Sequence, residues 1–138
     1  MSWYVHHVNI ASSDVEASAY FLRELIGIPQ GVFETPGAGK TGTFERSNDF
    51  LAVFGEENKG IHVVKPMPTF AKDNGFIHNP TIGGHFALNV PDLQAVIARL
   101  EKAGIPYTDA GVYAMKGVHQ IYVYDPSFNL IEINQDVG

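Results

Sequence analysis

Four residues with side chains that commonly bind metal ions stand at matching positions in two similar halves of this sequence. They are His7 and His62 in the first half, and His85 and Glu132 in the second. Imidazole and carboxylate groups suit divalent ions such as Zn, Ni, Co, Fe or Mn. If these four side chains meet on one surface, they can hold such an ion and leave positions open for water or a small-molecule substrate.

The two halves are related by an internal repeat. His7 and His85 are 78 positions apart, and each begins a segment that leads through a helical pattern to Gly-Ile-Pro. The last strands align as well, because Ile-His-Val around His62 matches Ile-Glu-Ile around Glu132. A repeat of this kind is one supersecondary unit, so we expect two similar modules. The repeat makes His85 the counterpart of His7, and Glu132 the counterpart of His62.

Strand alternation indicates which side chains can meet, because successive residues point to opposite faces of a sheet. In the predicted strand over residues 84–90, Phe86, Leu88 and Val90 share one face, and we expect them to pack under a helix. His85 then faces the opposite, concave side.

The first strand, over residues 3–11, follows the same rule. Val8 and Ile10 take the core side, so that His7 and Asn9 face the concave side. His6 falls on the core side or at its edge. Alternation therefore separates two adjacent histidines that composition alone does not distinguish.

The last strand places Glu132 on the concave side, between the core residues Ile131 and Ile133. A carboxylate among apolar residues is costly to bury unless it is paired or bound to metal. The sequence therefore predicts a site for one divalent metal ion, with the ligands His7, His62, His85 and Glu132.

The elements that position these residues follow the same plan twice. Helices are predicted at about 14–25, with Ser13 and Glu16 as a capping box, and at about 93–103, capped by Asp92. Strands are expected at 3–11, near 31–35, 42–46 and 50–54, and at 60–65, 84–90, 117–124 and 129–135. Residues 66–84 carry three prolines and three glycines and have no clear period, which indicates a long linker or lid.

Each half therefore reads β-α-β-β-β, which predicts an α+β fold. We expect paired βαβββ modules that form a curved, half-open barrel with the helices outside. The chain is one domain, residues 1–138, with module one at about 1–66, a linker at about 67–83 and module two at about 84–138.

Composition narrows the class of protein. The chain has 138 residues, a net charge of −6, and nine scattered Lys and Arg residues without a basic stripe, which argues against nucleic-acid binding. No apolar run approaches the ~18 residues of a membrane span, and the N-terminus lacks the pattern of a secretory signal. The absence of cysteine excludes thiolate ligands and fits a cytoplasmic location. A soluble enzyme or a small-ligand binder remains.

The chain resembles the vicinal oxygen chelate superfamily, which includes glyoxalase I, extradiol dioxygenases, methylmalonyl-CoA epimerase and bleomycin resistance proteins. The resemblance covers nearly the whole chain and is carried by His7-Val-Asn-Ile10, Gly84-His-Phe-Ala87, and Tyr122-Val-Tyr-Asp-Pro126 with Glu132. It implies a divalent metal on His7, His85 and Glu132, and a substrate chelated through adjacent oxygens. His62 occupies the fourth place, where glyoxalase I-like members commonly have glutamate. The resemblance also implies a homodimer.

Three functions remain open within this resemblance. A lyase or isomerase of glyoxalase type, with Glu132 as the general base, is slightly favoured. The alternative is an extradiol ring-cleaving dioxygenase, because two histidines and one carboxylate match the facial triad of non-haem Fe(II) enzymes. The second alternative is a non-catalytic protein of bleomycin-resistance type that binds or sequesters a small ligand.

Other polar residues have both a functional and a structural interpretation. Tyr122 should face the concave side and could donate to a substrate oxygen, or be a half-buried strand tyrosine. His78 could close over the site, although a solvated loop histidine is the better interpretation. Asn9 and Asn89, which are repeat mates, are expected to orient the metal histidines. His119, on the core-side parity, is expected to be structural.

Overall fold

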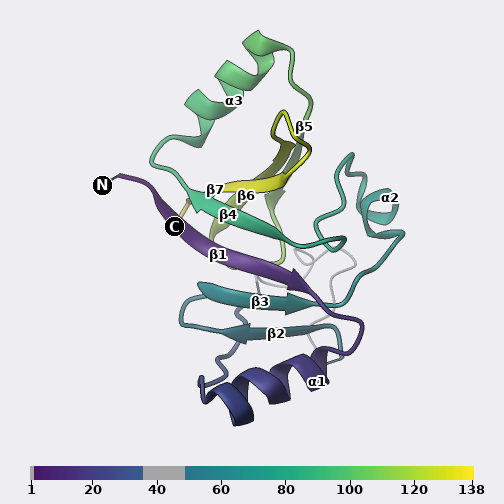
Figure 1. Cartoon of the computed structure of the whole chain (residues 1–138). Helices are drawn as coiled ribbons and strands as arrows, with labels where there is room; N and C mark the ends of the chain where they lie inside the picture. The colour runs from purple at the N-terminus through teal and green to yellow at the C-terminus, as the bar shows by residue number, and fades with distance from the viewer. Residues whose placement is uncertain (1, 36–48) are drawn as a thin grey trace.

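The computed structural model describes residues 2–35 and 49–138, and its central feature is one curved seven-stranded sheet (Figure 1). The strands are β1 (Tyr4–Ala11), β2 (Leu51–Phe54), β3 (Gly60–Val64), β4 (His85–Asn89), β5 (Tyr107–Val112), β6 (Val118–Tyr124) and β7 (Leu130–Asp136). The helices are α1 (Val15–Tyr20), the π-helical η1 (Phe21–Ile26), α2 (Phe70–Asn74) and α3 (Leu93–Ala103).

The strand order shows the predicted repeat. It is β2-β3-β1-β4-β7-β6-β5, with β1 parallel to β3, β4 parallel to β7, and β1 antiparallel to β4 at the centre. The edge strands β2 and β5 do not pair with each other in the described part of the chain, so the sheet curves without closing. This arrangement confirms the expected α+β fold with a half-open sheet.

The second half forms the complete β-α-β-β-β unit, from β4 through α3 to β5, β6 and β7. The first half differs from the prediction. Residues 31–35 form no strand, and the strand expected near 42–46 lies outside the described residues. The backbone at Gly31 passes so close to Gly55 that a Cβ there would lie 2.3 Å from its carbonyl oxygen. The next residues bond to a side chain, because Glu34 N–H donates to Asn58 Oδ1 at 2.7 Å. A contact with the side chain of Asn58, which is distant in the sequence, thus replaces the expected strand pairing.

Both long helical segments begin at an aspartate. Asp14 Oδ1 accepts from the Ala17 N–H at 3.0 Å, and Asp92 Oδ1 accepts from the Ala95 N–H at 3.0 Å. The predicted Ser13–Glu16 capping box is therefore wrong by one residue, and the repeat mates Asp14 and Asp92 cap alike.

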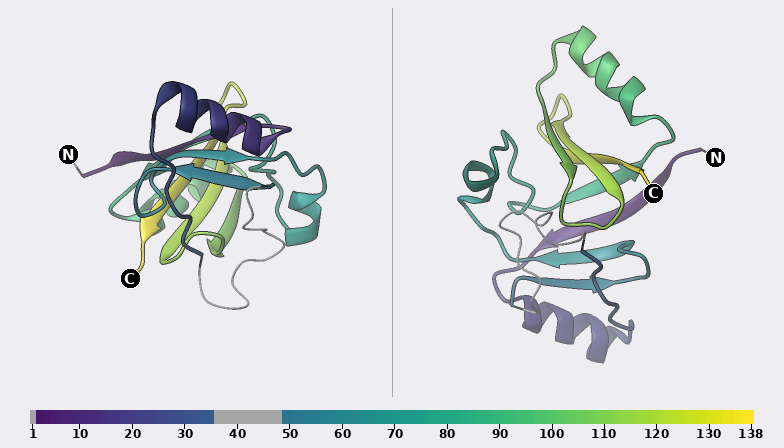
Figure 2. Two further views of the ribbon diagram at one scale, coloured as in Figure 1. Left: turned by 90° about the horizontal axis from the view of Figure 1, so that it is seen from below. Right: turned by 180° about the vertical axis from the view of Figure 1, so that it is seen from behind.

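The helices cover the outer strands of the sheet and leave its centre bare. Val15 and Ala19 of α1 pack on the cluster that contains residues of β2 and β3, while α3 packs on the β6 and β7 side (Figure 2). Over β1 and β4 the side chains of Val8, Ile10 and Phe86 remain 43%, 39% and 38% exposed. The expected helix packing is therefore wrong for Phe86, and Val8 and Ile10 are not core residues, whereas Val90 packs against the α3 cluster as expected.

Residues 66–84 form an ordered connection that includes α2. The Met67 N–H donates to Thr81 Oγ1 at 2.9 Å, and Asn79 Nδ2 donates to the Met67 carbonyl at 2.9 Å. His78 is buried, with Nδ1 2.6 Å from Thr108 Oγ1 and its ring against Tyr124. The solvated-loop interpretation of His78 is therefore wrong. Among the described residues, no helix is both long and apolar enough to cross a bilayer.

Candidate metal centre

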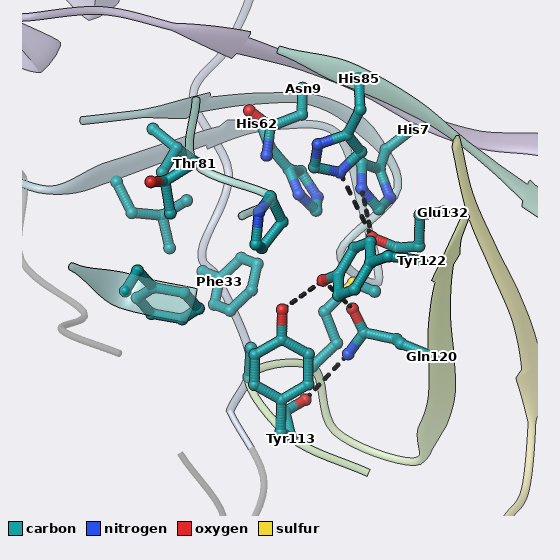
Figure 3. A pocket seen from close by; sticks show the side chains of 16 residues that line it. His7, Asn9, Phe33, His62, Thr81, His85, Tyr113, Gln120, Tyr122 and Glu132 are labelled. Atoms are coloured by element: carbon teal, nitrogen blue, oxygen red, sulfur yellow. Dashed lines mark hydrogen bonds and ion pairs between the residues drawn. The ribbon is translucent and has the colours of Figure 1, made fainter. Parts of the chain in front are cut away.

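Three of the four predicted ligands meet on the concave face of the sheet. His7 of β1, His85 of β4 and Glu132 of β7 each offer one ligand atom, and these atoms lie within 4.8 Å of one another. His7 Nε2 and His85 Nε2 each lie 3.4 Å from Glu132 Oε1 (Figure 3). All three residues are buried.

Strand register explains why these residues converge. Ala87 of β4 is the register partner of both His7 and Glu132. His7, Ala87 and Glu132 therefore form one row across β1, β4 and β7. The methyl group of Ala87 leaves the space between its two long neighbours open. His85 lies two residues away on the same strand, and therefore on the same face.

The donor set fits a divalent ion. Neither ring nitrogen of His85 makes a hydrogen bond within the described residues, although both are buried and Nε2 lies 3.4 Å from Glu132 Oε1. Buried polar atoms are normally hydrogen-bonded, so such an atom needs an explanation, for which a bound ion is one choice. Two imidazoles and one carboxylate are donors that suit Zn, Ni, Co, Fe or Mn.

The charge of Glu132 is stabilised where it stands. Burial alone would raise the pKa of this carboxyl group, but His7 and His85 outweigh it and hold the pKa well below its usual range. The other oxygen is fixed, since Asn134 Nδ2 donates to Glu132 Oε2 at 2.8 Å and Asn89 Nδ2 donates to Asn134 Oδ1 at 2.9 Å. The buried amides thus orient the carboxylate so that Oε1 faces the histidines.

These contacts also show what the two asparagine repeat mates do. Asn89 acts on the carboxylate through Asn134, and not on a metal histidine as expected. Asn9 is the register partner of His85, and its Oδ1 has no hydrogen bond within the described residues.

His62 stands outside the cluster, although its backbone position is the counterpart of Glu132. Its ring stacks on the ring of His7, and its Nε2 donates to the Asn58 carbonyl at 2.6 Å. Burial, followed by the neighbouring His7, lowers the pKa of His62 well below its usual value. The side chain is therefore a neutral ring packed beside a candidate ligand in this structure.

His6 lies beside His7, which strand alternation did not predict. The two Nδ1 atoms are 2.9 Å apart, and both residues are 2% exposed. Burial, followed by the charge of His7, lowers the pKa of His6 to about 4. The cause of the misplacement is a β-bulge between Val5 and His7, for which the sequence gives no signal.

Tyr122 lies at the edge of the cluster in a buried hydroxyl network. Its ring is edge-on to His85, with centroids 5.8 Å apart. Its hydroxyl contacts that of Tyr113 and donates to Gln120 Oε1 at 3.3 Å. Burial, Tyr113 and Glu132 raise the pKa of Tyr122 well above its usual value, so this hydroxyl is a donor and not a base. The sequence prediction found Tyr122 but missed its partner Tyr113.

A half-open cavity lies against the three candidate ligands (Figure 3). Its walls are mainly apolar and aromatic, from Phe33, Leu51, Phe70, Tyr113 and Met115. None of the described residues that line it is lysine or arginine. His78 and His119 are not among the lining residues, and His119 Nε2 instead lies 2.7 Å from Asp109 Oδ1.

The fold and the cluster together define a class: paired α+β modules around a buried site of two histidines and one carboxylate. The family model of the Glyoxalase/Bleomycin resistance protein/Dioxygenase superfamily matches residues 4–133, and the chain belongs to this superfamily. This confirms the resemblance stated from the sequence. No curated protein has a significant match to the chain.

Solved structures of the same superfamily share the fold. A superfamily member from Vibrio splendidus 12B01 is 15% identical, with a TM-score of 0.59 over 97% of this chain and 99% of that chain. Methylmalonyl-CoA epimerase from Mycobacterium tuberculosis is 17% identical, with a TM-score of 0.58 over 97% and 88%. The halotolerant catechol dioxygenase BphC is 15% identical, with a TM-score of 0.56 over 95% of this chain and 39% of that chain. At these identities the likeness shows the fold alone.

Proposed function

We propose that this protein is a metal-dependent enzyme that holds one divalent ion with His7, His85 and Glu132 and acts on a small, uncharged, oxygen-bearing molecule. The observation that carries the proposal is the convergence of three buried donors, with both histidine Nε2 atoms 3.4 Å from one oxygen of the carboxylate, at a cavity whose walls are mainly apolar. A bound ion supplies Lewis acidity to adjacent substrate oxygens.

The chain's own residues have separate roles in this proposal. Asn134 fixes the Glu132 carboxylate, and the mainly apolar walls surround the substrate. Tyr122 remains protonated and donates a hydrogen bond to a substrate oxygen after giving up its contact with Gln120. In a lyase or isomerase, Glu132 receives the proton that moves.

Within the described part of the chain the cavity has no lysine or arginine in its walls, which argues against a large anionic substrate. Methylmalonyl-CoA epimerase from Streptomyces coelicolor has been crystallised with 2-nitronate-propionyl-CoA, whose CoA portion carries phosphates. Phosphate groups are usually held by arginine, lysine or a helix N-terminus, and the described lining residues include neither cation. We therefore favour a small neutral substrate over an acyl-CoA.

The donor set supports a second candidate, a ring-cleaving dioxygenase. With His62 turned away, the cluster has two histidines and one carboxylate, which is the combination found in non-haem Fe(II) oxygenases. Both oxygens of Glu132 are also engaged, which leaves the carboxylate less free to act as a base. The aromatic walls would accept a catechol ring.

Metal analysis tests the proposal directly. Protein purified without a His-tag and supplemented with Fe(II), Ni, Co, Zn or Mn in turn should retain about one ion per chain, and the His85→Ala variant should retain none. Oxygen uptake with catechols on the Fe(II) form would support the dioxygenase, and turnover without oxygen uptake the lyase or isomerase. Failure of the wild-type protein to retain any ion would overturn the proposal and favour a ligand-binding protein without metal.

The bare strip over β1 and β4 supports a homodimer. Val8, Ile10 and Phe86 form an exposed apolar surface there, and surfaces of this kind often mark protein contacts. Light scattering should show a dimer that Phe86→Lys disrupts. Leu25→Lys, at a site on η1 that is 64% exposed, serves as the control and should remain a dimer.

A further inference from the structure

The bulge in β1 places two consecutive histidines beside the candidate metal centre. Opposite β4, Val5 pairs with Leu88 and His7 with Ala87, so His6 is an extra residue in β1 without a partner on β4. A bulge interrupts the alternation of side chains, and His6 and His7 are accordingly both buried. Without the extra residue, His6 would lie on the face opposite His7.

The contact between the two rings fixes one end of the His7 imidazole. The two Nδ1 atoms are 2.9 Å apart, and the ring planes make an angle of 81°. The other nitrogen of His7, Nε2, lies 3.4 Å from Glu132 Oε1. One proton must lie between the two Nδ1 atoms, because a hydrogen bond needs one donor and one acceptor.

The position of that proton decides whether His7 can bind a metal ion. A neutral imidazole that carries its proton on Nδ1 has a free lone pair on Nε2, whereas the other tautomer has none there. His7 Nε2 can therefore coordinate an ion only when His7 donates from Nδ1 and His6 Nδ1 accepts. The same contact fixes the rotation of the His7 ring.

The other two donors differ in whether a neighbouring side chain holds them. Glu132 is held by Asn134, whereas His85 Nδ1 has no hydrogen bond among residues 2–35 and 49–138. The ring of His6 also stacks on Tyr4, with centroids 6.2 Å apart, so its own orientation is restricted. Groups that hold the second nitrogen of a metal-binding histidine typically change metal affinity when they are altered.

We infer that His6 is a positioning residue whose Nδ1 accepts the Nδ1–H of His7 and thereby keeps His7 Nε2 available to a metal ion. The inference rests on the proposed metal site and adds a residue to it that does not touch the ion.

Two substitutions separate the hydrogen bond from the packing. His6→Phe keeps a ring of similar size but removes the acceptor, and His6→Asn restores an acceptor oxygen at a similar distance from the backbone. Calorimetric titration with Zn²⁺ should show metal binding about 10- to 100-fold weaker in His6→Phe, with partial recovery in His6→Asn. His119→Phe, which changes a histidine paired with Asp109, should leave the affinity unchanged.

A spectroscopic measurement on the Zn²⁺-loaded protein tests the same inference independently. In the nitrogen-15 NMR spectrum of the imidazole groups, wild-type His7 should carry a proton on Nδ1 that exchanges slowly with water because His6 accepts it, and His6→Phe should make this exchange faster. If wild type binds no metal, the proposed function fails; if wild type and a folded His6→Phe protein bind Zn²⁺ equally well, only the inference fails. An unchanged exchange rate of the His7 Nδ1 proton together with unchanged Zn²⁺ affinity in His6→Phe would overturn the inference.

Discussion

The rings of His7 and His62 lie face to face, with centroids 3.8 Å apart and planes 15° from parallel. His62 donates from Nε2 to the Asn58 carbonyl, and this bond holds its ring against the face of the His7 ring. A histidine in the place symmetrical with Glu132 thus contributes packing to the cluster.

This arrangement predicts that replacing His62 and replacing His85 have different effects on metal binding. His62→Ala should retain about one ion per chain with weaker affinity, because His7 loses a packing partner but all three donors remain. His85→Ala should lose the ion. Elemental analysis after dialysis distinguishes the two, and loss of the ion from His62→Ala would show that His62 turns to become a ligand in the loaded protein.

The amide chain behind Glu132 should be needed for stability. Asn134→Leu leaves the buried Glu132 Oε2 and Asn89 Nδ2 without their partners, each at a cost of about 1–3 kcal/mol. Urea titration should therefore show a free energy of unfolding lower by about 2–5 kcal/mol. Asn89→Leu removes only the outer end of the chain and serves as the matched comparison. Equal losses in the two variants would contradict a special role for the bond to the carboxylate.

His78 should make the 66–84 connection sensitive to acid. The Thr108 oxygen already accepts the backbone N–H groups of Ile77 and His78, so its hydroxyl donates to His78 Nδ1, and a proton on Nδ1 breaks this contact. Burial lowers the pKa of His78 below 6.5, so the unfolded chain takes up this proton first as pH falls. Stability from His78 is therefore complete above pH 6.5 and is lost progressively below it.

His78→Asn provides the measurement, since other buried histidines titrate in the same direction. The melting temperature of wild type should fall more steeply than that of His78→Asn as the pH is lowered from about 7.5 to about 5. Parallel profiles for the two proteins would contradict the prediction.

The hydroxyl of Tyr122 should contribute to turnover without setting its pH dependence. Tyr122→Phe is expected to lower kcat/KM roughly tenfold, the effect of one neutral hydrogen bond to substrate. Because its pKa is raised, wild type should show no loss of activity from tyrosine ionisation up to about pH 10. Metal content serves as the control and should be unchanged. An activity unaffected by the substitution would assign Tyr122 to packing alone.

Phe128 is a site where a substitution should stabilise the fold. It adopts a positive φ of 64° in the turn between β6 and β7 and is 79% exposed. A non-glycine residue in this conformation costs roughly 1–2 kcal/mol, and only part of that is offset by contact with Tyr124. Phe128→Gly should raise the free energy of unfolding by up to about 1 kcal/mol. Phe128→Ala keeps the strain and loses the ring, so it should be less stable than wild type in the same denaturant titration.

Much of the fold could be predicted because it depends on patterns that survive in a single sequence. The repeat placed β1 and β4 in equivalent positions, and the Asp92 cap marked the start of α3. Helix coverage could not be predicted this way, since alternation identifies two faces but not which part of a face a helix reaches. Val8 and Phe86, which lie where no helix reaches the sheet, are therefore exposed although the pattern predicted a core face.

The strand positions of the candidate ligands could be predicted from the sequence, but the directions of all their side chains could not. Parity and the repeat put His7, His85 and Glu132 on one face, and the structure brings their donor atoms together. The direction of the His62 side chain depends on Asn58 in a loop, which a strand pattern does not describe. The place of His6 depends on a bulge, and an inserted residue leaves no mark on a pattern of period two.

The ladder between β1 and β4 is where the two halves of the molecule join, and the candidate donors lie on both sides of it. An ion bound by His7 from one half and by His85 and Glu132 from the other would act as a crosslink. At a free concentration 100 times its Kd, a ligand of the folded state adds about 2.7 kcal/mol to stability. Chelation should therefore loosen the join before either half unfolds, and amide hydrogen exchange along the β1–β4 ladder should speed up first.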